Sequence, residues 1–177
     1  MSKGQEIIGQ IFVYMLSAAV IIFVVVYGYG AVKNFKQKSE EIADIRFNQN
    51  LKESFNRLYT NIGSTIVYDN NNRFPVSSNY KKVCFAETDT NDYVSAEALS
   101  SYPLIKASIC GSGQCNNCND CSRDNVFLVT DDMEKSFYIK NLEVGNNNNF
   151  LCINVENGHI NFKLESKGKY VLVTPID

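Results

Sequence analysis

The feature that most constrains this chain is a long run of apolar residues near its N-terminus. No charged residue occurs between Glu6 and Lys33, and Ile11–Val32, which we call the apolar segment, reads IFVYMLSAAVIIFVVVYGYGAV. About 20 apolar residues are enough to cross a bilayer as a helix. A cleaved secretory signal usually has a shorter apolar region of about 7–15 residues. We therefore predict a transmembrane helix, in preference to a cleaved signal or the buried helix of a soluble domain.

The charges that flank the apolar segment leave its orientation open. Lys33, Lys36 and Lys38 follow the segment, whereas Lys3 is the single lysine before it. Because lysine and arginine tend to stay in the cytoplasm, this bias favours a cytoplasmic C-terminal part. Six cysteines lie in that same part, and paired cysteines are typical of exported domains. The two signals point to opposite orientations.

An amphipathic pattern continues beyond the apolar segment. No proline occurs before Pro75, and Gly63 is a typical helix stop. The pattern predicts one helix through residues 5–62, on the order of 85 Å long at about 1.5 Å per residue. We expect residues 5–34 to form its transmembrane or filament-core part and residues 35–62 to pack on a globular domain. The predicted packing stripe is Ile42, Ile45, Leu51, Phe55, Leu58 and Ile62.

Residues 63–177, which we call the head, read as an antiparallel sheet. Alternating apolar residues flank Asn157-Gly158, a strong signal for a two-residue hairpin turn because both turn residues favour positive φ. The register predicts three cross-strand pairs on one face: Val155–Ile160, Ile153–Phe162 and Leu151–Leu164.

Other strands are predicted at residues 64–68, 81–86, 126–130, 137–144 and 170–174. The fold class is therefore α+β, with the long N-terminal helix packed on a meander-like antiparallel sheet of five to seven strands.

All six cysteines lie in the head. Cys84 and Cys152 alternate away from apolar neighbours, so both are expected to leave the sheet on its polar side, and a cross-strand bridge between them would explain that placement. The other four lie in a Cys-rich loop at 110–121, where they would pair among themselves or with a strand cysteine. That loop contains Cys110, Cys115, Cys118 and Cys121.

A metal site is the alternative for these four loop cysteines. The spacing of the last three matches the first three ligands of a bacterial iron–sulfur motif, but the fourth cysteine and the proline after it are missing. Four cysteines also suffice for zinc. Disulfides require export, whereas metal thiolates suit the cytosol, so the compartment decides between the two.

The composition gives no support for an enzyme. The single histidine, His159, follows the Asn-Gly turn at a polar strand position, which is typical of a surface or turn residue. No glycine-rich phosphate loop is present. The net charge of −2 does not favour a nucleic-acid partner. We predict no catalytic residue, no cofactor and no nucleic-acid binding.

The residues directly before the apolar segment resemble a known processing site. Lys3-Gly4-Gln5 is similar to the end of the short leader of archaeal type IV pilin-like precursors, which carry a class III signal peptide. The layout of apolar helix, amphipathic helix and β-rich head is also pilin-like. The resemblance implies a leader at residues 1–4 that a prepilin peptidase removes between Gly4 and Gln5. Many pilins carry a glutamate several residues later that meets the terminal amine of the neighbouring subunit; here Glu6, at the second mature position, is the only candidate.

The same resemblance implies a function. The precursor would be anchored in the membrane with an extracellular head, and the mature chain would polymerise with other copies into a cell-surface filament with an adhesive role. The residues expected to mediate assembly are Glu6, Ile11, Phe12, Val20, Phe23 and Val26. Two alternatives remain open: a single-pass anchor for an exported binding domain that does not polymerise, and a cytosol-facing domain with a Cys-ligated zinc or iron–sulfur centre.

Overall fold

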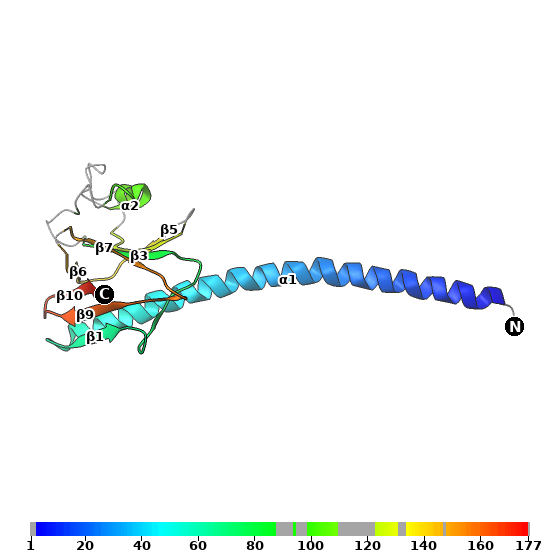
Figure 1. Cartoon of the computed structure of the whole chain (residues 1–177), viewed down its shortest axis with the longest axis horizontal. Helices are drawn as coiled ribbons and strands as arrows, with labels where there is room; N and C mark the ends of the chain where they lie inside the picture. Colours follow the sequence, from blue (N-terminus) through cyan, green and yellow to red (C-terminus); the bar gives the residue numbers. More distant parts are fainter. Residues whose placement is uncertain are drawn as a thin grey trace. The chain divides into compact units, whose positions relative to one another are not determined.

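A computed structural model describes residues 3–87, 94, 99–109, 123–130, 134–146 and 148–176 (Figure 1). The chain divides into two compact units, Met1–Ile42 and Ala43–Asp177, and we call the second the folded unit. The architecture is α+β, as predicted, with a long N-terminal helix and mostly antiparallel sheets.

The first helix, α1, spans Lys3–Tyr59 without interruption. The prediction of one continuous helix is confirmed, although it ends three residues earlier than expected. Gly63 then adopts a φ of 79°, and its backbone N–H donates to the carbonyl oxygen of Ser166 at 3.2 Å. Because glycine enters this left-handed region without steric cost, Gly63 redirects the chain from the helix into the first strand.

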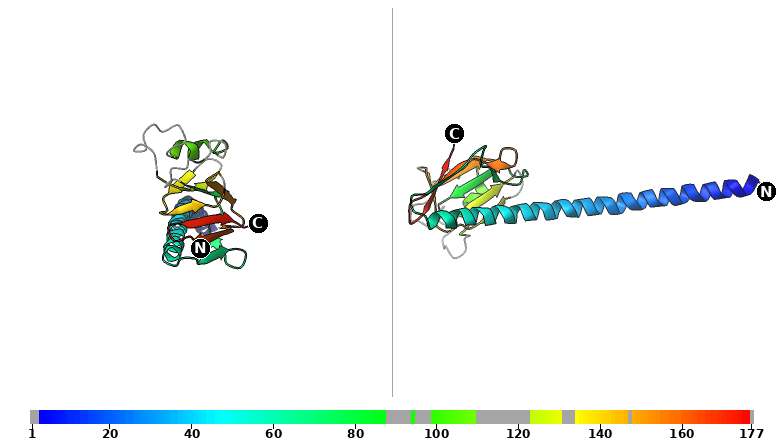
Figure 2. Two further views of the ribbon diagram at one scale, coloured as in Figure 1. Left: turned by 90° about the vertical axis from the view of Figure 1, so that its left-hand side faces the viewer. Right: turned by 90° about the horizontal axis from the view of Figure 1, so that it is seen from below.

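The folded unit contains ten strands and a short second helix, α2 (Pro103–Ser108), among its described residues. The strands are β1 (Thr65–Tyr68), β2 (Phe74–Pro75), β3 (Lys82–Ala86), β4 (Val126–Val129), β5 (Glu134–Phe137), β6 (Leu142–Val144), β7 (Phe150–Asn154), β8 (His159–Ile160), β9 (Phe162–Ser166) and β10 (Val171–Pro175). They form two four-stranded sheets, in the orders β1-β9-β10-β6 and β5-β4-β3-β7, and a β2-β8 pair. All pairs are antiparallel except β10 with β6. Figure 2 shows the strands, drawn as arrows, from two further sides.

The C-terminal part of α1 shares one hydrophobic core with both four-stranded sheets. Phe47, Leu51, Phe55 and Leu58 are each at most 3% exposed. Their partners come from β3, β4, β6, β9 and β10. The prediction that the amphipathic half of the helix packs on the sheets is therefore confirmed for its stretch from Phe47 to Leu58.

The predicted packing stripe was partly wrong. Ile42, Ile45 and Ile62 are exposed, whereas Phe47, which the stripe omitted, is buried. At about 100° per residue, the four buried side chains lie within about 80° of one another, and Ile45 lies about 160° from Phe47. Ile62 lies beyond the end of the helix. The predicted stripe therefore combined residues from two different faces of the helix, because it stepped six residues from Ile45 to Leu51.

The hairpin prediction was right about the turn and wrong about the ladder. Asn157 and Gly158 have φ of 51° and 76°, and Glu156 and His159 exchange both backbone hydrogen bonds across them. Beyond that pair the strands separate: β7 pairs with β3, while β9 pairs with β1 and β10. None of the three predicted pairs forms a ladder, because alternation fixes the buried face of a strand but not its partner. The three are Val155–Ile160, Ile153–Phe162 and Leu151–Leu164.

Residues 137–144 were also predicted as one strand and are instead parts of two. Phe137 ends β5 in one sheet, and Leu142 begins β6 in the other. Between them Asn141 has a φ of 59°, a conformation that asparagine tolerates better than most residues. The single meander-like sheet was therefore an incorrect prediction, since this segment and the Asn-Gly turn both carry the chain from one sheet to another.

A second hydrophobic cluster covers the face of β3 that was expected to be polar. Cys84, Phe127 and Phe150 contribute from the sheet, and Leu99, Ile105 and Ile109 contribute from the segment that contains α2. All six are at most 6% exposed. Short elements with weak periodicity cover this face, which is why the sequence pattern did not reveal it.

Candidate functional site

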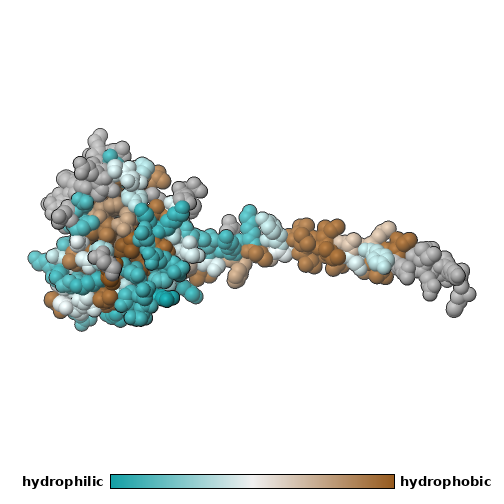
Figure 3. Space-filling view, in the orientation of Figure 1, coloured by the Kyte–Doolittle hydropathy of each residue, from teal (hydrophilic) through white to brown (hydrophobic). Residues whose placement is uncertain are grey.

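The apolar segment is the most exposed hydrophobic surface of the described chain. α1 contains a stretch that is long and apolar enough, by length and composition, to cross a membrane, and none of that stretch is buried. Much of this part of the helix is hydrophobic in Figure 3 (brown). The predicted assembly residues Ile11, Phe12, Val20, Phe23 and Val26 are between 50% and 67% exposed. Such a surface is typical of a membrane or protein interface.

The C-terminal end of the apolar segment has the residues of a membrane–water boundary. Tyr27 and Tyr29 are exposed on α1, and Lys33, Lys36 and Lys38 follow them. Tyrosine is enriched at headgroup depth, and lysine extends its ammonium into water beyond it. This order indicates that a membrane-embedded α1 would leave the bilayer near residues 27–33.

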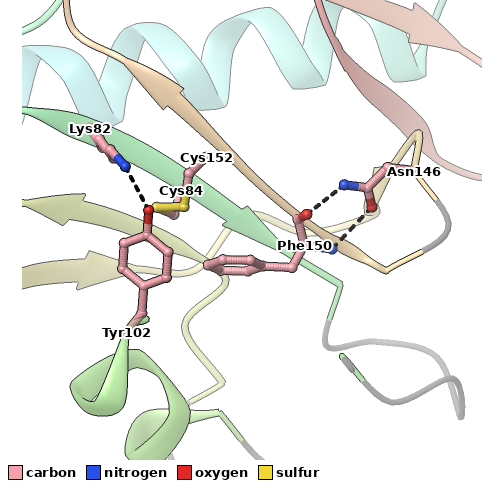
Figure 4. The surroundings of a disulfide bond; sticks show 6 residues. All are labelled: Lys82, Cys84, Tyr102, Asn146, Phe150 and Cys152. Atoms are coloured by element: carbon pink, nitrogen blue, oxygen red, sulfur yellow. Dashed lines mark hydrogen bonds between the residues drawn. A yellow bond between two sulfur atoms is a disulfide. The ribbon is translucent and has the colours of Figure 1, made fainter. Parts of the chain in front are cut away.

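A disulfide joins Cys84 of β3 to Cys152 of β7, as the strand alternation suggested (Figure 4). The two residues are direct cross-strand partners. The backbone N–H of Val155 donates to Lys81 and that of Glu87 donates to Asn149, so Cys84 and Cys152 occupy a non-hydrogen-bonded position of the ladder. Side chains are closest at such positions. Because disulfides persist in oxidising compartments, the bridge favours an extracellular location for the folded unit.

Next to the disulfide, the segment that contains α2 packs against the sheet, although it is distant from β7 in the sequence. The Lys82 ammonium donates to the Tyr102 hydroxyl at 2.9 Å, and the Tyr102 ring lies 5.6 Å from that of Phe150. Asn146 holds the other end of β7 by donating to the Phe150 carbonyl and accepting from its N–H (Figure 4). Cys84 is fully buried beneath this arrangement. Both cysteines pack in the second cluster, so the bridge fastens β3 to β7 beneath the segment that contains α2 and is structural in its placement.

Other predicted site residues have different outcomes. Gly4, Gln5 and Glu6 lie in the first turns of α1. The Cys-rich loop lies outside the described residues, so its disulfide and metal alternatives both stay predictions. That loop contains Cys110, Cys115, Cys118 and Cys121. Among the residues that the structure describes, no three His, Cys, Asp or Glu side chains are grouped to hold a metal ion.

The surface assignment of His159 was wrong. Its side chain is 6% exposed, and Nδ1 lies 3.3 Å from the carbonyl oxygen of Asn157. The histidine lines a cavity of about 160 Å³. The six lining residues are Ile153, Asn154, Glu156, His159, Asn161 and Ile176. The polar–apolar alternation of residues 154–161 is the signal that could have revealed this shared face.

Glu143 and Glu87 form a pair of interacting carboxylates in another part of the folded unit. Partial burial raises the pKa of Glu143 on β6 above its ordinary value, and the charge of Glu87 raises it further, whereas a hydrogen bond from Tyr170 acts in the opposite direction. The protonated form of Glu143 is thus favoured by folding. The stabilisation from protonated Glu143 is fully present at pH values below the pKa of this carboxyl in the unfolded chain. It is lost as the pH rises through the higher pKa of the same carboxyl in the folded chain.

We expect Glu143→Gln to raise the melting temperature at pH 7, because the neutral amide removes both the desolvation cost and the repulsion from Glu87. The gain should shrink toward zero as pH falls below the ordinary glutamate value, where wild-type Glu143 is also neutral. Thermal unfolding from pH 3 to pH 8 measures this difference. Glu53→Gln, at an exposed position of α1, is the matched control. A gain from Glu143→Gln that is equal at all pH values would contradict the assignment.

Comparisons with known protein families, curated proteins and solved structures find no match to this chain.

Proposed function

We propose that the chain is a pilin-like structural subunit of an extracellular filament that assembles through the apolar segment of α1. The observation that carries the proposal is the division of one unbroken helix into two kinds of surface. Its apolar segment is exposed and free of charge, whereas its C-terminal part holds Phe47, Leu51 and other buried residues in the core of a β-rich unit.

The physics of the apolar segment supports assembly. Lipid tails and neighbouring apolar helices solvate such a surface about equally well. A chain that leaves the bilayer must therefore exchange lipid for copies of itself. Lys3-Gly4-Gln5, which resembles a leader cleavage site, lies shortly before the segment, and the Cys84–Cys152 bridge fits a folded unit outside the cell. Other copies of the chain, the membrane and a prepilin peptidase are the proposed partners, and adhesion is the proposed role of the exposed head.

The first test of this proposal is the N-terminus of the mature protein. In the native host, N-terminal sequencing and intact mass should show a chain that begins at Gln5. Gly4→Val, which places a β-branched residue at the cleavage point, should leave the chain beginning at Met1 and without filaments. A wild-type chain that keeps Met1 and stays monomeric in detergent would instead favour the anchored binding domain that does not polymerise.

The second test is a charge in the apolar segment. Val20→Arg should abolish filaments in negative-stain micrographs, because one arginine at the centre of a membrane helix costs about 2.5–3.5 kcal/mol in insertion and has no partner in an apolar bundle. Val20→Ile is the matched control and should assemble normally. Filaments that form equally well with Val20→Arg would exclude this segment as the assembly surface.

A further inference from the structure

We propose that neighbouring copies of the chain pack their α1 helices in parallel with an axial offset that sets a basic block of one copy against an acidic block of the next. The basic block is Lys33, Lys36 and Lys38, and the acidic block is Glu40 and Glu41. Both blocks follow the apolar segment directly and lie in the first compact unit. The inference rests on the proposed filament and names the contact that fixes the offset between its subunits.

The charges of the two blocks are available to another copy. The three lysines and Glu41 are exposed on α1, and Glu40 is partly exposed. No ion pair between described residues involves either block, whereas Asp44, the next acidic residue, is paired with Lys135 at 2.5 Å. Pairing within the helix is weak, because a lysine that precedes its glutamate by four residues, as Lys36 precedes Glu40, has the less favourable order. The chain itself therefore leaves both blocks largely unmatched.

The basic block opposes the orientation that the rest of the structure favours. Lysines next to a membrane helix tend to stay on the cytoplasmic side. The Cys84–Cys152 bridge favours the extracellular side for the folded unit that follows the block. With the folded unit outside, the three lysines work against insertion of the helix. A charge pattern that opposes insertion points to another role for these lysines, and a contact between subunits supplies one.

The order of the blocks along α1 predicts how neighbouring copies are displaced. Two parallel helices in register would place lysine beside lysine and glutamate beside glutamate, and like charges repel. Antiparallel helices would match the blocks, but the apolar segment inserts every copy in the same direction. A parallel pair with an offset is the remaining arrangement. The centres of the blocks are about five residues apart, which corresponds to an offset of roughly 7 Å at about 1.5 Å per residue.

The alternative partner of the basic block is the membrane itself. Lysines beside a membrane helix attract anionic lipid headgroups. The same headgroups would repel the acidic block, which begins two residues after Lys38. A second copy of the chain carries the complement of both blocks, whereas a lipid surface complements only one. The charges therefore favour a second copy over lipid.

The test reverses the charge of each block, and then of both, in the full chain in its native host. The basic-block variant carries Lys33→Glu, Lys36→Glu and Lys38→Glu, and the acidic-block variant carries Glu40→Lys and Glu41→Lys. Each variant alone gives this stretch a single sign of charge, so neighbouring copies repel and the filament mass should fall about tenfold or more. The combined variant restores opposite charges at the same offset and should assemble about as well as the wild type.

Controls separate a loss of assembly from a loss of folding or insertion. Lys52→Glu reverses an exposed charge of α1 outside both blocks and should assemble as the wild type does. Protease treatment of intact cells should show the folded unit outside for every variant, and denaturant titration in detergent should give the wild-type midpoint. If the acidic-block variant inserts the wrong way, the other two variants decide, because both carry fewer lysines than the wild type.

Electron cryo-microscopy of wild-type filaments measures the offset directly and should place the basic block of one copy level with the acidic block of a neighbour. The inference alone is overturned if wild-type filaments form and the basic-block variant forms them equally well, or if the combined variant fails to assemble. Variants that assemble normally but leave the membrane more readily would overturn it in favour of lipid headgroups. A wild-type chain that forms no filaments would overturn the proposed function together with this inference.

Discussion

Replacing both Cys84 and Cys152 with alanine should lower the free energy of unfolding of the folded unit by about 4 kcal/mol. The bridge joins residues 68 positions apart, and closing a loop of that length in the unfolded chain accounts for about 4 kcal/mol in the chain-entropy model. The loss of the buried Cys84 sulfur from the second cluster adds to this effect.

Denaturant titration of the full chain in mild detergent, read by pulse proteolysis, measures this change. Val129→Ala, which trims a side chain packed against the same cluster but leaves the bridge intact, is the control and should cost far less. Adding reductant to the double variant then measures what the loop cysteines contribute to the free energy of unfolding. A double variant with the wild-type unfolding midpoint would show that the bridge has no stabilising role.

Leu51→Ala should lower the free energy of unfolding by about 3 kcal/mol, since it removes a large, fully buried side chain and leaves a cavity between α1 and the sheets. Ile45→Ala is the matched control. It truncates an aliphatic residue on the same helix, within the same unit, at a position that is 50% exposed. The control should change stability by less than about 0.5 kcal/mol.

The pair of variants distinguishes packing from helix propensity. Alanine is a better helix former than either leucine or isoleucine, so propensity alone would make both variants neutral or slightly stabilising. Equal destabilisation by the two variants would contradict the packing of α1 against the sheets. The same titration with pulse proteolysis serves as the measurement.

The sequence allowed the long helix to be predicted because its signals are local. Charge-free composition over the apolar segment and the absence of proline before Pro75 each act within a few turns. The Asn157-Gly158 turn was equally predictable, since positive φ at both positions is a property of those two residues. The Cys84–Cys152 bridge was also within reach, because alternation turned both thiols away from the apolar neighbours in their strands.

Strand partners could not be predicted in the same way. Whether β9 pairs with β7 or with β1 and β10 depends on contacts between residues far apart in the sequence. Each strand alternates correctly in either arrangement, so the pattern does not separate them. The second cluster was missed for a related reason: Leu99 and Ile105 cover Cys84 from a short segment without clear periodicity. The cavity at His159 was missed because a turn histidine was taken to face solvent.

The continuity of α1 has a mechanical consequence. A tensile load applied to residues 11–32 would pass through the hydrogen-bonded backbone of one helix into the core, since no loop intervenes between Lys3 and Tyr59. The helix would then be held by four buried side chains that pack against both sheets, and pulling it out would require breaking those contacts. They are Phe47, Leu51, Phe55 and Leu58. The covalent link between β3 and β7 would limit how far that core can open under force. Resistance to pulling is thus distributed over four side chains and one sulfur–sulfur bond.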